Sequence, residues 1–195
     1  EGVILLNGID IRKYRYDEYM DIFSVVFQDF KLFALPLGQN VATAQHYDVA
    51  RAADCLQKAG FSDRLARMPK GLDTCLYKDL DEDGVTISGG EAQKIAIARA
   101  LYKDAPFIVL DEPTAALDPV AEAEIYAKFN EIAGDKTAIY ISHRLSSCKF
   151  CDEIAVFDHG EVVQQGTHEE LLGEPDGKYY ELWNAQAQYY TEESA

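Results

Sequence analysis

The chain has 195 residues, 48% of them hydrophobic, which is enough apolar material for one domain, or for one domain with a subdomain. Its formal net charge of −16 argues against an extended DNA- or RNA-binding groove, because such grooves need clustered Lys and Arg. No stretch approaches the roughly 18 consecutive apolar residues that cross a bilayer, and the N-terminus lacks the pattern of a secretory signal.

The first elements in chain order are a hairpin, a strand and a helix. Residues 2–11, GVILLNGIDI, contain two apolar runs around an Asn-Gly pair, which is typical of a tight β-hairpin. Residues 21–28, DIFSVVFQ, predict a buried strand that ends at Gln28. Apolar residues then recur with helical period over residues 48–59, and Gly60 is a suitable helix stop.

A helical region with weaker signals continues over residues 62–77 and leads into an acidic loop, KDLDEDG, at residues 78–84. Ser-Gly-Gly at residues 88–90 then precedes a helix-forming stretch, and the N–H groups and hydroxyl at such a helix start suit a phosphate. The same residues also fit an ordinary N-cap, because Ser88 and Glu91 have the spacing of a capping box. The expected buried face of this helix consists of Ile95, Ala98, Leu101 and Tyr102.

The rest of the chain alternates strands with helices, which predicts an α/β layer with a parallel sheet. PFIVLDEP at residues 106–113 and TAIYISH at residues 137–143 are two of the strands. Asp118-Pro119 has the residue types of a helix start. The stripe expected to be buried behind it is Ala121, Ile125, Phe129 and Ile132. Two more strands are expected within residues 153–166, and a last helix over residues 179–188 with one face made of Tyr179, Leu182, Trp183 and Gln186.

The four cysteines, at positions 55, 75, 148 and 151, do not form the pattern of a secreted disulfide framework. We therefore expect reduced cysteines in a cytosolic environment. Cys148 and Cys151 have the C-x-x-C spacing that zinc sites and redox enzymes share, but the sequence has neither a second ligand pair nor a redox-type strand–helix–strand context. We interpret them as ordinary side chains.

Polar side chains follow three of the expected strands at their carboxyl ends, where open parallel sheets bind ligands. They are Gln28, the pair Asp111 and Glu112, and His143. An apolar strand that ends in adjacent carboxylates suits a magnesium nucleotide site, in which Asp111 faces the metal and Glu112 orients an attacking water and accepts its proton. The pair also fits a strand that ends in solvent, and His143 alone fits a structural histidine.

Five short motifs occur in a fixed order along the chain. They are VVFQDF with Gln28, ISGGEAQ at residues 87–93, FIVLDEP with Asp111 and Glu112, AALD ending at Asp118, and ISHR with His143. In this order they resemble the Q-loop, signature, Walker B strand, D-loop and switch histidine of an ABC transporter nucleotide-binding domain, over nearly the whole chain. The signature is normally written LSGGQ, so Ile87 and Glu91 depart from it. DEDG, MPKGLDTCL and the tail GKYYELWNAQAQYY resemble exporter-type members of bacterial kind.

The resemblance implies an α/β fold of the P-loop NTPase (RecA-like) class, here as a partial ABC ATPase core with a short N-terminal β-hairpin. Residues 1–30 and 105–195 would form the RecA-like core, and residues 31–104 a helical subdomain with the Q-loop and signature. The implied function is ATP hydrolysis coupled to transmembrane export.

The resemblance also implies that the cofactors are ATP and Mg²⁺. Asp111 and Gln28 would hold the metal, and Glu112, His143 and Gln28 would be catalytic. The residues that would contact an ATP held by the opposite subunit are Ser88, Gly89, Gly90, Glu91 and Asp118. The implied partners are a second nucleotide-binding domain and the transmembrane domains of the exporter, with no nucleic acid, at the cytoplasmic face of the cell membrane.

A P-loop, G-x-x-x-x-G-K-[ST], is missing from the sequence, and so is the aromatic residue that stacks on adenine in this family. GEPDGKYY and GDKT lack the required glycine spacing. In the family the hairpin follows shortly after the P-loop helix, so we expect the chain to be a truncated form of a complete ATPase. The alternative is a natural protein that has lost the ability to bind nucleotide. For the chain by itself we expect little ATP affinity and negligible hydrolysis.

Two other functions fit the same motifs. A soluble ABC ATPase of translation or DNA repair would share them, but usually carries a second cassette or long insertions. A non-catalytic module would present its signature turn to the ATP of a partner. The transported substrate and the choice between homodimer and heterodimer are not encoded in these motifs.

Overall fold

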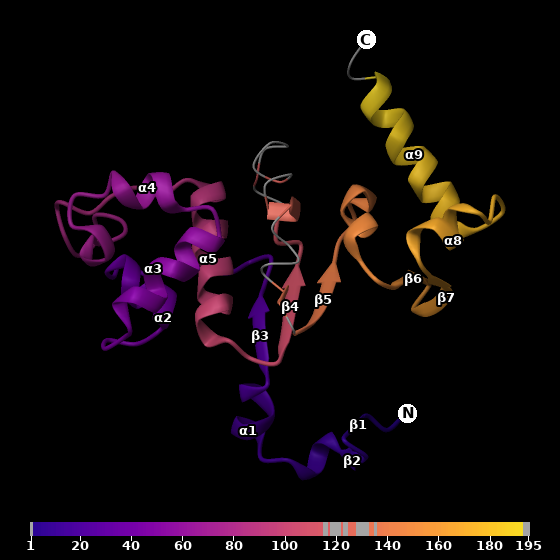
Figure 1. Ribbon diagram of the computed structural model, residues 1–195, viewed down its shortest axis with the longest axis horizontal. Helices are drawn as coiled ribbons and strands as arrows, with labels where there is room; N and C mark the ends of the chain where they lie inside the picture. The colour runs from indigo at the N-terminus through magenta and orange to yellow at the C-terminus, as the bar shows by residue number, and fades with distance from the viewer. Residues whose placement is uncertain are drawn as a thin grey trace. The chain divides into compact units, whose positions relative to one another are not determined.

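The structure, a computed structural model, describes residues 2–114, 117, 122, 125–127, 133–134 and 136–192. The chain forms two compact units, Glu1–Ile141 and Ser142–Ala195 (Figure 1). The elements of the first unit are β1 (Leu5–Leu6), β2 (Ile9–Asp10), α1 (Tyr16–Asp21), β3 (Phe23–Val26), α2 (Leu37–Ala42), α3 (Val49–Lys58), α4 (Ser62–Ala66), α5 (Gly89–Lys103), β4 (Phe107–Asp111) and β5 (Thr137–Ile141), with 3₁₀ turns at Ile11–Lys13 and Gly71–Asp73. Those of the second are a 3₁₀ turn (Leu145–Phe150), β6 (Ile154–Asp158), β7 (Glu161–Gly166), α8 (His168–Leu172) and α9 (Lys178–Glu192).

The N-terminal hairpin pairs β1 with β2 in antiparallel register, as predicted. Its turn needs positive φ at both central positions, and Asn7 (φ 51°) and Gly8 (φ 76°) are residue types that adopt this conformation readily. Helix α1 follows and was not expected from the sequence. Asp17 and Glu18 lie in its first turn, where carboxylates interact favourably with the helix dipole.

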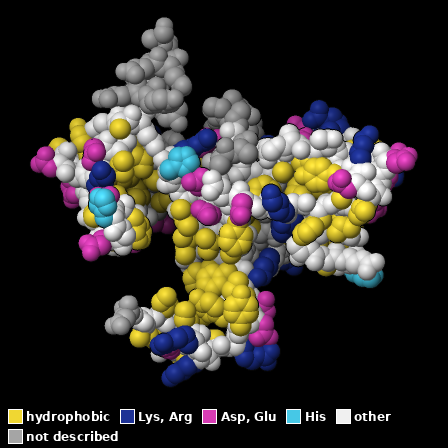
Figure 2. Space-filling view, turned by 180° about the vertical axis from the view of Figure 1, so that it is seen from behind, with side chains coloured by type: hydrophobic (Ala, Val, Ile, Leu, Met, Phe, Trp, Pro, Cys, Tyr) yellow, Lys and Arg dark blue, Asp and Glu magenta, His cyan; other side chains and the backbone are white. Residues whose placement is uncertain are grey.

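A parallel sheet in the order β3-β4-β5 forms the centre of the first unit (Figure 1). Val26 pairs with Leu110 of β4, and Leu110 pairs with Tyr140 of β5, so the carboxyl ends of the three strands lie at one edge. One face of the sheet packs into the hydrophobic core. The opposite face is less covered, and Ile139 and Ile141 of β5 are 46% and 51% exposed. Hydrophobic side chains are accordingly visible on the surface in Figure 2.

Helix α5 is the central helix of the first unit and packs against α2, α3 and β3. It is buried on more than one side, because its buried residues include both Ile95 and Ala98 and the stripe Gln93, Ala96, Ile97 and Ala100. Leu101 and Tyr102, expected on the buried face, are partly buried against the same core. Helix α3 begins at the N-cap Asp48 and ends before Gly60 (φ 74°), as predicted.

The loop between β3 and α2 is held by the buried side chain of Asn40 and the partly buried side chain of Arg99. The Asn40 side chain accepts a hydrogen bond from Phe33 N (2.8 Å) and donates to the carbonyl oxygens of Phe33 and Leu35. Arg99 of α5 donates from Nε to Asn40 O (2.9 Å) and from Nη1 to Lys31 O (3.2 Å). Burial lowers the pKa of Arg99, but the ordinary pKa of an arginine side chain is so high that Arg99 stays charged at neutral pH.

In the second unit, β6 and β7 pair antiparallel through a turn at His159 and Gly160, as predicted, with an irregular register between Val156 and Phe157. Helix α8 begins with a capping box between Thr167 and Glu170. The core of this unit consists of Leu145, Ile154, Val156, Leu171 and Tyr179, with Cys148, Cys151, Leu172 and Trp183 packed against it.

Three predicted segments need correction. The strand over residues 21–28 is shorter, because Asp21 ends α1 and β3 covers only Phe23–Val26. The strand over residues 137–143 ends at Ile141. The last helix is longer than expected, and of the face expected on it Tyr179 is buried whereas Leu182 is 37% exposed. The helix expected after Asp118 lies largely outside the described residues, although Ile125 is helical and buried.

The four cysteines, which the sequence predicts to be reduced, form no disulfide bond in the structure. Burial raises the pKa of the Cys148 thiol, and burial raises that of Cys151 to about 11, which keeps both protonated at neutral pH. None of the helices in the described part of the chain is long and apolar enough to cross a membrane.

Candidate functional site

The carboxyl edge of the sheet brings together three of the polar residues that the sequence singled out. Asp111 is the last residue of β4, and Glu112 follows it. Gln28 lies two residues beyond β3 and donates a hydrogen bond from Nε2 to Glu112 Oε2 (3.0 Å). Because β3 and β4 are parallel neighbours in register, the strand pairing itself places these groups at one edge.

The backbone of Glu112 is held in an unusual conformation. Its φ of 47° lies in the left-handed region of backbone conformation, which residues other than Gly, Asn and Asp rarely adopt. Glu112 N donates to Ile141 O of β5 (3.0 Å), and Glu112 O accepts from Nε2 of Gln93 in α5 (3.0 Å). The main chain is therefore anchored on both sides at the point where the carboxylate leaves the sheet.

The turn at the start of α5 contains the predicted capping box. Glu91 N donates to Ser88 Oγ (3.3 Å), and Ser88 N donates to Glu91 Oε2 (2.9 Å). The other oxygen of Glu91 lies 2.9 Å from Nε of Arg64, whose Nη2 donates to Thr86 O (3.2 Å). Arg64 thus contacts the chain on both sides of the turn.

The capping box and the anion site are compatible with each other. Ser88 uses its oxygen as the acceptor in the cap, so its hydroxyl hydrogen can still be donated to a phosphate oxygen. Ser88 and Gly89 are exposed at the helix N-terminus, where the backbone N–H groups and the helix dipole favour an anion. The carboxylate of Glu91 opposes this preference, and Arg64 compensates its charge.

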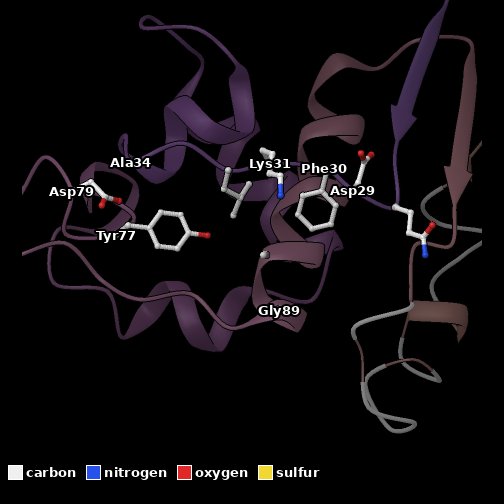
Figure 3. A pocket seen from close by; sticks show the side chains of 10 residues that line it. Asp29, Phe30, Lys31, Ala34, Tyr77, Asp79 and Gly89 are labelled. Carbon is white, nitrogen blue, oxygen red and sulfur yellow. The ribbon is translucent and has the colours of Figure 1, made fainter.

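A cleft of about 600 Å³ lies between the segment after β3 and the start of α5. Phe30 and Tyr77 line it, and Gly89 lies between them in the view of Figure 3. Asp29, Lys31 and Asp79 add charged groups to the lining. Asp79 belongs to the acidic loop that the sequence predicted.

A magnesium ion would need oxygen ligands at the edge of the sheet. The carboxylate of Asp111 and the amide oxygen of Gln28 are ligands of this kind, and the Gln28 amide nitrogen is directed at Glu112, so its carbonyl oxygen is directed elsewhere. Within the described residues, no three His, Cys, Asp or Glu side chains form a group that could hold a metal by themselves. A site that relies on one carboxylate plus substrate phosphates is usual for Mg²⁺, so the residues fit.

The remaining predicted site residues are His143 and Asp118. His143 is the second residue of the second unit, where its carbonyl oxygen accepts a hydrogen bond from Gln186 of α9. The side-chain amide oxygen of Gln186, Oε1, accepts a hydrogen bond from Leu145 N (2.9 Å). Asp118 lies outside the described residues.

Two residues of the site, Gln93 and Arg64, were not predicted from the sequence. Gln93 interrupts an apolar stripe with Ala96, Ile97 and Ala100, and a polar residue in such a stripe signals a buried hydrogen bond. The sequence around Arg64 has no comparable signal, because the contact joins two residues, Arg64 and Glu91, that are 27 positions apart in the sequence. Only the packing of α4 against the loop before α5 could have revealed it.

Comparisons with known proteins give a consistent result. A sequence profile of the family described as ABC transporter matches residues 1–115. The chain is 41% identical over 191 residues to an ATP-dependent lipid A-core flippase of Idiomarina loihiensis, and 40% identical over 192 residues to the mitochondrial iron-sulfur clusters transporter ATM1 of Candida glabrata. A solved bacterial Atm1-family ABC exporter with ATP bound is similar in structure, with a TM-score of 0.86 at 37% identity.

These matches cover nearly all of this chain but a minor part of the other proteins. They include 95% of this chain in both curated relatives, but only 31% of the flippase and 25% of ATM1. For the solved exporter the shares are 96% and 32%. The comparisons also confirm the fold class expected from the sequence, an α/β fold of the P-loop NTPase class.

Proposed function

This chain belongs to the ABC transporter family, and from that premise we propose that it is the ATP-binding and ATP-hydrolysing part of an exporter that couples hydrolysis to transport across a membrane. The observation that carries the proposal is the cluster of Gln28, Asp111 and Glu112 at the carboxyl edge of the sheet. The names of the relatives, a flippase and a transporter, support the coupling to transport.

In this proposal Glu112 is the general base. Its carboxylate orients an attacking water and accepts the proton of that water, while Gln28 holds the carboxylate through the 3.0 Å hydrogen bond. Asp111 and the amide oxygen of Gln28 hold Mg²⁺, which when bound neutralises charge on the phosphate oxygens. His143 is proposed as a further catalytic residue on the strength of the resemblance.

The start of α5 is proposed to contact a second nucleotide, different from the one that would be hydrolysed beside Glu112. Ser88, Gly89 and Gly90, with Glu91 and Asp118 beside them, are proposed to contact an ATP held by a second nucleotide-binding domain. Ser88 and Gly89 are exposed, which supports this role. A turn that bound only the nucleotide of its own chain would not need to be accessible to a second domain.

The cleft beside the acidic loop is proposed as the surface that receives the transmembrane part of the exporter, at the cytoplasmic face of the membrane. The aromatic residues Phe30 and Tyr77 in its lining support this assignment, and so does the presence of Gln28 and Gly89 in the same lining. We also propose the division into a RecA-like core, residues 1–30 and 105–195, and a helical subdomain, residues 31–104. Helices α2 to α5 fall within the second range.

The test uses the whole protein that contains this chain, in an ATPase assay with the substitution Glu112→Gln. We expect ATP binding to be kept and turnover to fall by roughly 100-fold or more, since a general base contributes about that factor or more. Glu169→Gln, an exposed position on α8, is the matched control and should hydrolyse ATP like the wild type. Unchanged turnover in Glu112→Gln would remove Glu112 from the mechanism.

A wild-type protein that binds ATP but does not hydrolyse it would favour a non-catalytic module. This second function is supported by one observation, the exposed and capped turn at Ser88, which could complete the site of a partner without any hydrolysis at Glu112.

A further inference from the structure

We propose that Gln93 is a positioning residue for the general base, and that it acts through the main chain of Glu112. The inference rests on the proposed function of Glu112 and adds a residue whose role in the reaction the motifs do not assign. Gln93 would touch neither ATP nor water. It would set where the Glu112 carboxylate lies.

The first observation is the burial of Gln93. Its side chain is 2% exposed, in the interior of α5 among Ala96, Ile97 and Ala100. A buried amide is costly unless it is hydrogen-bonded, and here Nε2 donates to Glu112 O at 3.0 Å. A polar side chain in this position therefore has a specific partner across the boundary between α5 and the end of β4.

The second observation is the backbone conformation that this bond supports. Glu112 has a φ of 47°, and a non-glycine residue in this region costs about 1 kcal/mol or more unless its surroundings hold it there. Two hydrogen bonds hold its main chain, one from Glu112 N to Ile141 O and one from Gln93 Nε2 to Glu112 O. Loss of the second would allow the peptide after Glu112 to rotate.

The third observation connects this peptide to the chemistry. The Glu112 carboxylate is aligned by Gln28 from another strand end, at 3.0 Å, so rotation of the Glu112 main chain would strain or break this alignment. A displacement of about 1 Å at a reacting group can lower a rate by about 100-fold. Gln93 also lies in the same rigid helix as the turn at Ser88, so α5 holds the turn and the base at a fixed spacing.

The experiment compares Gln93→Met with the wild type in the whole protein. Met has nearly the shape of Gln but no N–H donor, so the core stays filled while the bond to Glu112 O is lost. We expect kcat for ATP hydrolysis to fall roughly 10- to 100-fold, with KM for MgATP changed by less than about 3-fold. The matched control is Gln57→Met, at an exposed position of α3, which should behave like the wild type.

A double substitution separates positioning from a general loss of structure. In the Glu112→Gln background, Gln93→Met should cause no further loss of the residual activity, because the group that Gln93 positions is already absent. A further loss of similar size there would overturn the proposal, and so would a wild-type kcat for Gln93→Met alone. If Gln93→Met does not fold, Gln93→Leu takes its place, and failure of both to fold would show that Gln93 serves stability instead.

The controls distinguish the two levels of inference. If the wild type hydrolyses ATP and Glu112→Gln does not, the proposed function holds, and the result for Gln93→Met bears on the positioning role alone. If the wild type does not hydrolyse ATP, the proposed function itself fails.

Discussion

At the scale of single residues, the contact between Arg64 and Glu91 is predicted to affect how the turn at Ser88 takes part in ATP-dependent association. Arg64→Met would leave the Glu91 carboxylate without its 2.9 Å partner, next to the place where a phosphate is proposed to bind. We expect ATP-dependent association of two copies of the whole protein to weaken by less than about 5-fold, because a partly exposed ion pair contributes about 1 kcal/mol or less. Sedimentation of the Glu112→Gln form with ATP would measure this.

The matched control is Arg67→Met in the same segment, because Arg67 is exposed and its side chain donates from Nε to the nearby Asp63 carbonyl oxygen (3.0 Å). Adding Glu91→Gln to Arg64→Met should restore association, since it removes the charge that Arg64 compensates. If the double variant associates as weakly as Arg64→Met, charge compensation is not the role of Arg64.

The site residues differ in how far the sequence could predict them. Asp111 and Glu112 follow an apolar strand, and that local pattern was sufficient to predict their place at the edge of the sheet. Gln28 was singled out only by the order of motifs, and its hydrogen bond to Glu112, which joins residues 84 positions apart, was not predicted. The positive φ of Glu112 had no signal at all, because the anchors that hold it come from β5 and α5.

At the scale of elements, the start of α3 depends on one side chain. The carboxylate of Asp48 accepts a hydrogen bond from Arg51 N at 3.0 Å and caps the helix. We expect Asp48→Ala to lower the free energy of unfolding of the chain by about 1 kcal/mol. Urea denaturation would measure the change. Asp54→Ala removes the same charge from the same helix but no cap, so its cost should be smaller, at most about 0.5 kcal/mol.

The end of α5 is linked to β5 by an ion pair, which makes this link sensitive to acid. The Lys136 ammonium, 2.8 Å from Asp104, lowers the pKa of that carboxyl mainly through a side-chain hydrogen bond. Because the folded pKa lies below the unfolded value of about 3.9, the pair stabilises the fold above that pH and its contribution is lost as the pH falls through the folded pKa.

Asp104→Asn should therefore be less stable than the wild type at neutral pH, by less than about 1 kcal/mol because the pair is partly exposed, and the difference should vanish at an acidic pH below the folded pKa of Asp104. Asn suits the left-handed conformation of position 104 (φ 58°), so the backbone is not the cause of the change. Unfolding measured at both pH values checks this. An equal difference at both would exclude the ion pair as its origin.

Elements with a strong local signal agreed with the sequence, and those without one did not. Helix α3 has a cap, an amphipathic period and a terminal glycine, and its predicted bounds were correct. Helix α1 has six residues and none of them is buried, so no apolar period could reveal it. The predicted strand at residues 21–28 was too long because the apolar run extends beyond the residues that pair with β4.

At the scale of the whole molecule, the fold class followed from the order of the motifs, whereas the division into units did not. The prediction at this scale concerns nucleotide binding by the 195-residue chain alone, whose sequence lacks a P-loop to surround the β- and γ-phosphates. We expect calorimetric titration with MgATP to detect little binding and ATPase assays to detect negligible hydrolysis. Micromolar affinity would mean that the residues present hold the phosphates in another way.

The exposed side of β5 has a consequence for how the chain behaves in solution. In the described residues β5 is an edge strand, and Ile139 and Ile141 project from a sheet face that is only partly covered. Such an edge can accept an additional strand from another molecule, which is the first step of self-association and of aggregation. An extended apolar peptide supplied in trans would compete for the same edge, because it would pair with β5 in place of a strand from another copy.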